Sequence, residues 1–199
     1  MRSNVCKIEK GTQDQAAIFM ECEKVAAYNG LDHKQALQLR LLCEEIDGML
    51  PWLIEDFEGK LWIDFEDGVC KVNVSIDAPD LTANKKEQLI AIAKNKRNAA
   101  AVGLVGKIRC CIEDFFLEEV LVHQYPMSSG MFHLAGGYSD GVDFGYLWSL
   151  DQYRLSVQQE QQGEQWDELE KSVLASVADD VTVGVQAKQV NITVVKRFA

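Results

Sequence analysis

The stretch from residue 61 to residue 77 constrains the fold most, because it is typical of a β-hairpin. Two runs in which apolar and polar residues alternate, at 61–66 and 69–77, are joined by the dipeptide Asp67-Gly68. This dipeptide readily adopts the positive φ angles of a two-residue turn. Alternation with a period of two gives the hairpin one apolar face and one polar face, so another element must cover the apolar one.

Residues 33–53 are predicted to form a long helix that supplies such a cover. Apolar residues recur at helical spacing in Leu42, Ile46, Met49 and Leu53. Asp32 precedes the run and is a suitable N-cap, whereas Pro51 lacks a backbone donor and should kink or end the helix near Trp52.

This helix carries two adjacent acids in different environments. Glu44 falls on the polar side, but Glu45 falls inside the apolar arc, between Leu41 and Met49. A carboxylate in that arc loses hydration unless a polar group meets it. Two interpretations stay open: Glu45 reaches solvent or pairs with a basic side chain, or it lines a cavity and has a function there.

The composition excludes several classes of function. The chain has 199 residues and a formal net charge of -11, which argues against nucleic acid or an anionic membrane as the main partner. Its six cysteines show no CxxC spacing, so no zinc site is indicated, and they suit buried apolar positions. The N-terminal residues contain no apolar run typical of a signal peptide, and we expect a cytoplasmic protein.

The order of the predicted elements indicates an α+β fold. A helical pattern at 14–29 is ended by Gly30, and further helices are predicted at 107–119, 148–157 and 165–178, before strands at 181–185 and 190–198. We expect a two-layer α/β sandwich, a mixed sheet with helices on one face. It would be a single domain over 1–199, with its core at about 12–112 and 179–199 and an elaboration at about 113–178.

Three short motifs then carry a resemblance to a known superfamily. They are LLCEEIDGML at 41–50, IDAPD at 76–80 and VGLVGKI at 102–108. In this order, around a hairpin, they resemble the boxes of the GHKL (histidine-kinase-like) ATPases, and the small anti-sigma-factor serine kinases look most similar. The resemblance covers roughly the first 112 residues and the last 20.

The resemblance implies a cytoplasmic regulatory protein that binds ATP or ADP. Glu45 would be the general base beside the γ-phosphate, and Asp77 would contact the adenine amino group. Gly103 and Gly106 would form a phosphate cradle before a helix, with Lys107 offsetting phosphate charge together with Lys94, Lys96 and Arg97. The implied partners are nucleotide and a regulatory protein, and a homodimer is allowed.

Departures from the family pattern leave a second interpretation open. Met49 stands where the family has the asparagine that coordinates magnesium, and a thioether is a poor ligand for this hard cation. Pro79 and Leu81 replace glycines of the second box. The chain is therefore expected to show weak or absent ATP turnover, as a degenerate ATPase or serine kinase. The alternative is a pseudo-ATPase that binds no nucleotide and serves as a protein-interaction module.

Overall fold

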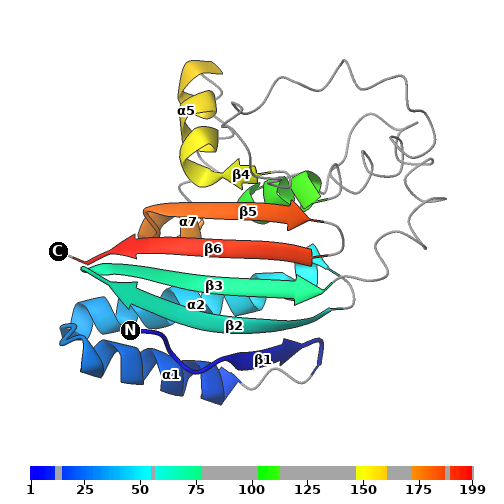
Figure 1. Cartoon of the computed structure of the whole chain (residues 1–199). Helices are drawn as coiled ribbons and strands as arrows, with labels where there is room; N and C mark the ends of the chain where they lie inside the picture. Colours follow the sequence, from blue (N-terminus) through cyan, green and yellow to red (C-terminus); the bar gives the residue numbers. More distant parts are fainter. Residues whose placement is uncertain are drawn as a thin grey trace, which may run out of the picture.

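A computed structural model of the chain describes residues 1–11, 15–54, 57–77, 103–112, 147–160, 172–186 and 189–198 (Figure 1). The elements are β1 (Cys6–Glu9), α1 (Gln15–Tyr28), α2 (His33–Leu53), β2 (Glu58–Glu66), β3 (Val69–Asp77), β4 (Leu147–Ser149), α5 (Leu150–Glu160), α7 (Val173–Val177), β5 (Asp180–Gln186) and β6 (Gln189–Arg197). Residues 103–112 form a further helix.

The strands form one six-stranded sheet in the order β1-β2-β3-β6-β5-β4. Every neighbouring pair of these strands is antiparallel, so the prediction of a mixed sheet is wrong for the described strands. Each of the β2–β3 and β5–β6 hairpins reverses the chain within a short turn, so its two strands are antiparallel. The two hairpins pair with each other through β3 and β6, which are also antiparallel. A parallel neighbour would need a crossover between the two strands.

The core lies on one face of this sheet. Residues opposite each other on paired strands share a face, and the row Leu61–Val74–Ile192 is buried throughout. Buried side chains of α1, α2, α7 and the helix 103–112 pack into the same apolar cluster. In Figure 1, α1 and α2 lie behind the strands. The prediction of an α+β fold with helices on one sheet face is therefore confirmed for the described residues.

Local chemistry explains the two elements that the sequence predicts best. Asp67 and Gly68 have φ angles of 50° and 75°, as a tight turn between β2 and β3 requires. Asp32 caps α2 in a capping box, in which its carboxylate accepts from the Gln35 backbone N–H and the Gln35 side chain accepts from the Asp32 N–H. The helix continues through Pro51 and ends at Leu53.

The N-terminal segment joins the sheet, which the sequence pattern did not indicate. Its pairing with β2 changes register between Arg2↔Asp64 and Cys6↔Leu61, so the chain bulges between these two contacts. At the bulge, Asn4 donates its backbone N–H and its side-chain amide to the buried carboxylate of Glu21 on α1, at 2.9 and 3.0 Å. The sequence signal was weak because β1 contributes only two buried side chains.

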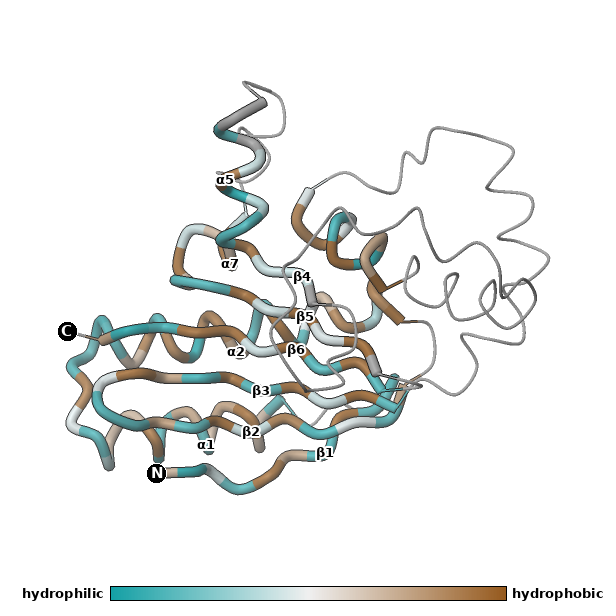
Figure 2. Tube along the Cα trace, turned by 45° about the horizontal axis from the view of Figure 1, so that its top comes forward, coloured by the Kyte–Doolittle hydropathy of each residue, from teal (hydrophilic) through white to brown (hydrophobic). Residues whose placement is uncertain are grey.

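The prediction of a helix at 148–157 is wrong at its start. Residues 147–149 form β4, which pairs with β5, and α5 begins at Leu150. In Figures 1 and 2, α5 projects away from the sheet. Arg154 fixes its base by donating to the backbone oxygens of Ala175 and Asp179, at the end of α7. Residues 113–119 and 165–171 of the other predicted helices lie outside the described residues.

Candidate functional site

The first predicted site residue is on α2. There the sequence predicts that Glu45 lies in the apolar face of the helix, but the structure buries Asp47 instead. Glu45 is partly exposed and does not belong to the buried face of the helix. The buried acid is Asp47, whose exposed fraction is 1%. It accepts a hydrogen bond from the Gln15 side chain of α1 at 3.1 Å.

Burial raises the pKa of Asp47, and the hydrogen bond from Gln15 partly opposes that shift. The helical wheel could have identified Asp47, because it follows Cys43 by four residues and precedes Leu50 by three, and both neighbours are fully buried. The structure thus gives Asp47 a role in joining α1 to α2. It leaves Glu45 accessible to solvent.

Met49 occupies the position at which the resemblance implies a magnesium ligand. Its side chain is 5% exposed and belongs to the apolar cluster beneath the sheet. A buried thioether among hydrocarbon side chains offers no hard oxygen donor. The residues present at this point therefore do not fit a magnesium ion.

Asp77 lies at the end of β3, on the face of the sheet that the helices do not cover. Its neighbour Ile76 is fully buried, and side chains alternate between faces along a strand. Asp77 is exposed and accepts a hydrogen bond from the Gln189 side chain at 3.3 Å. Glu45 lies on α2, which belongs to the helical layer on the other face of the sheet.

The third motif forms the start of the helix 103–112. Gly103 has a φ of 78° and nothing within 4 Å of the position where a Cβ would stand. Gly106 is buried. Lys107 lies over the ring of Tyr153 on α5, with its Nζ 5.7 Å from the ring centroid, so its charge has a cation–π contact. Pro79, Leu81 and the three basic residues at 94–97 lie outside the described residues.

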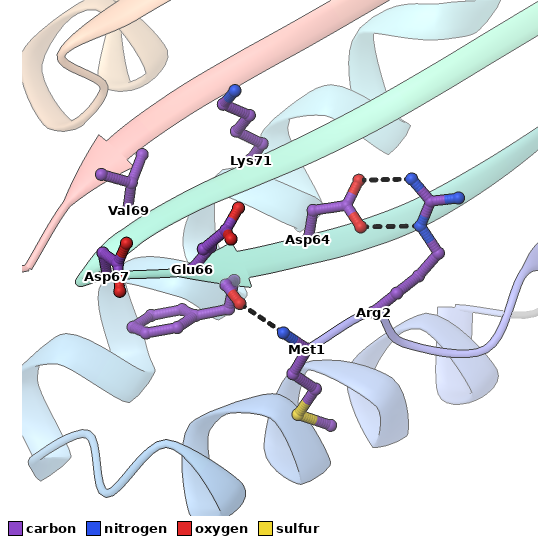
Figure 3. Close-up of a pocket in the computed structure, with 8 residues that line it drawn as sticks. Met1, Arg2, Asp64, Glu66, Asp67, Val69 and Lys71 are labelled. Carbon is purple, nitrogen blue, oxygen red and sulfur yellow. Dashed lines mark hydrogen bonds and ion pairs between the residues drawn. The ribbon is translucent and has the colours of Figure 1, made fainter.

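A shallow surface cavity of about 640 Å³ lies at the hairpin end of β3, opposite the end that carries Asp77 (Figure 3). Arg2 donates two hydrogen bonds to the Asp64 carboxylate within it, at 2.7 and 3.1 Å. Trp62 and Asn73 also donate to that carboxylate. Arg2 holds the pKa of Asp64 below its usual range. These polar groups satisfy one another, and none of the site residues predicted from the sequence lines this cavity.

Four cysteines from different elements are buried in the core: Cys6, Cys22, Cys43 and Cys70. A hydrogen bond with Cys22 and burial raise the pKa of Cys43 well above its usual value. Burial raises the pKa of Cys70 to about 12. The raised pKa values make the thiols of Cys43 and Cys70 poor nucleophiles, and all four cysteines pack in the core as small apolar side chains.

Within the described ranges, no cluster of three or more histidine, cysteine or acidic side chains could hold a metal ion. No helix in the same part of the chain is long and apolar enough to cross a membrane. Comparison of the chain with family models, with curated proteins and with solved structures finds no match.

Proposed function

We propose that this chain is a regulatory interaction module built on a histidine-kinase-like scaffold, without the magnesium-dependent ATP turnover of that superfamily. The order of elements supports the scaffold. Two helices precede a hairpin, a further helix starts at Gly103, and the closing β5–β6 hairpin pairs with β3. Buried side chains of α1, α2, α7 and the helix 103–112 share one apolar cluster with those of the sheet.

The observation that carries the proposal is the position of Met49 and Asp77. Met49 fills the metal-ligand position with a buried apolar side chain. Asp77 lies on the face of the sheet that the helices do not cover, whereas α2, which carries Glu45, belongs to the layer on the other face. A nucleotide held between sheet and helices would lack both its metal ligand and its adenine contact on that side. The scaffold is retained in this proposal, and its surfaces serve binding.

A second candidate is nucleotide binding with little or no turnover, which one feature favours. Gly103 combines a positive φ with open space beside its backbone at the start of a helix, the end at which the helix dipole favours an anionic phosphate. Glu45 is accessible enough to act as a base. In this candidate ATP or ADP binds through phosphate contacts and without magnesium.

Isothermal titration of the whole chain with ATP and with ADP, each with and without magnesium, distinguishes the interaction module from the nucleotide-binding candidate. Absence of heat at millimolar nucleotide is the result expected for the interaction module. Binding that is lost in G103A but kept in G30A would favour the second candidate, because both glycines have a positive φ and space for a Cβ, and only the first begins a helix. Robust phosphate release that requires magnesium would overturn both.

A further inference from the structure

The outer edge of β1 is open among the described elements. β1 is the last strand of the sheet, and in Figure 1 no other strand lies beyond it. Lys10 donates its backbone N–H to Phe57, so it points toward β2. Backbone groups alternate along a strand, so the N–H and C=O of Lys7 and Glu9 point away from β2. These two residues present unpaired backbone groups at the edge of the sheet.

The charges along this edge lie in two rows of like sign. On the uncovered face of the sheet, Lys7 lies directly opposite Lys60, and Glu9 lies directly opposite Glu58. The acidic row continues, because Glu58 lies opposite Asp77. Like charges directly across a strand pair destabilise it. Among the described residues, none of the four β1 and β2 side chains forms an ion pair.

We propose that β1 pairs with β1 of a second copy of this chain, antiparallel and centred on Ile8, to form a continuous sheet through a twofold dimer. In this register Lys7 lies opposite Glu9 of the second copy, and Glu9 lies opposite its Lys7. The row of lysines is thereby followed by a glutamate of the second copy, and the row of acidic residues by a lysine of the second copy. Lys7 also exchanges two backbone hydrogen bonds with Glu9 of the second copy, because the N–H and C=O groups of both residues point away from β2.

Charge selects this register over its neighbours. Centring the pair on Lys7 would set Lys7 against its own copy, and centring it on Glu9 would set two carboxylates together. A shift of one residue, which would set Lys7 opposite Ile8 of the second copy, would place outward-facing backbone groups against inward-facing ones, so the hydrogen bonds could not form. The proposed register is therefore the one that satisfies both backbone and side chains at this edge.

Apolar surface beside the edge supports the same contact. A groove of about 510 Å³ runs between β1 and α1, and Val5 and Met20 line it. Their exposed fractions are 53% and 52%, which is high for apolar side chains. A second strand along β1 would cover part of this groove. The contact is small, so we expect a reversible dimer of modest affinity.

Sedimentation velocity of the whole chain at low ionic strength, from low micromolar to several hundred micromolar, tests the proposal. The wild type should convert from monomer to dimer with concentration. The single variants K7E and E9K should each weaken the dimer at least about tenfold, because each turns two attractive pairs into repulsive ones. The double variant K7E/E9K restores complementarity and should recover the affinity to within about threefold.

The variant K7P provides a second measurement that does not depend on side-chain charge alone. The Lys7 N–H points away from β2, so proline removes a hydrogen bond of the dimer and none of the β1–β2 ladder. It should abolish dimerisation while the urea midpoint of the monomer stays close to wild type. Hydrogen exchange should show the Lys7 and Glu9 amides becoming protected as the dimer forms.

Three results would overturn the proposal. A wild type that stays monomeric at every concentration would mean that Lys7 and Glu9 only guard the edge against pairing. A dimer that is indifferent to K7E and E9K, or that leaves the edge amides unprotected, would use another surface. Failure of the double variant to regain affinity would refute the proposed register. None of these measurements depends on nucleotide, so their outcome is separate from that of the proposed function.

Discussion

Replacing Met49 with asparagine restores the residue that the family resemblance implies, and the structure predicts that the change destabilises the protein. Met49 is 5% exposed and packs in the apolar cluster between α2 and the sheet. The variant M49N loses apolar burial and introduces an amide with no partner among hydrocarbon side chains. The two effects together cost about 3 kcal/mol of unfolding free energy.

A loss of this size is readily measured. For a chain of 199 residues, it corresponds to a decrease in Tm of about 6–12 °C. The control is M49L, which keeps the volume and apolar character and should cost less than about 1.5 kcal/mol. Urea denaturation followed by circular dichroism gives the free energies, and thermal unfolding with and without magnesium and ATP gives the ligand response.

The same pair of variants tests the functional argument. If Met49 occupies the core, magnesium and ATP should raise the Tm of M49N no more than that of the wild type. A neutral M49N, within about 1 kcal/mol of wild type, would show that this side chain faces water. A selective increase of its Tm by magnesium and ATP would show that a metal site survives there, and the interaction-module proposal would then fail.

Three further predictions concern the framework. A Cβ on Gly59 would lie 2.6 Å from a backbone oxygen of β3, so G59A should cost about 2 kcal/mol or more, whereas G184A, with open space, should stay within about 0.5 kcal/mol in urea denaturation. E21Q should cost about 2 kcal/mol at neutral pH because the Glu21 carboxylate accepts charge-assisted hydrogen bonds from the Lys24 ammonium and from Asn4 at the bulge. Those bonds lower the pKa of Glu21, so its contribution is present above the ordinary glutamate pKa and lost as the pH falls through the lowered value; equal acid sensitivity of wild type and E21Q would contradict this. The pH dependence of stability has the opposite sign for Asp47. Burial raises the pKa of Asp47, so the wild type loses stability as the pH rises through the raised value. D47N should therefore be at least as stable as wild type at neutral pH, and a marked loss of stability there would contradict this assignment.

The predicted site on α2 shows what helical periodicity can predict and what it cannot. The wheel of α2 correctly gives Leu42, Ile46 and Met49 as its buried face, yet it pointed to Glu45 and passed over Asp47. A wheel ranks positions on an isolated cylinder. Which flank of the apolar stripe is covered depends on where α1 lies, and the Gln15–Asp47 contact belongs to that packing.

By itself the sequence determined the elements whose signals are local. The β2–β3 hairpin follows from alternation and the Asp67-Gly68 turn, and α2 follows from helical periodicity and the cap at Asp32. Only the tertiary structure decided that residues 6–9 and 147–149 are edge strands, that β3 joins β6, and that Asp77 faces away from the helices. The reason is physical. Turns and caps are satisfied by neighbours in the chain, whereas a strand's partner and the covered side of a residue depend on segments that are distant in the sequence; β6 lies more than a hundred positions after its partner β3.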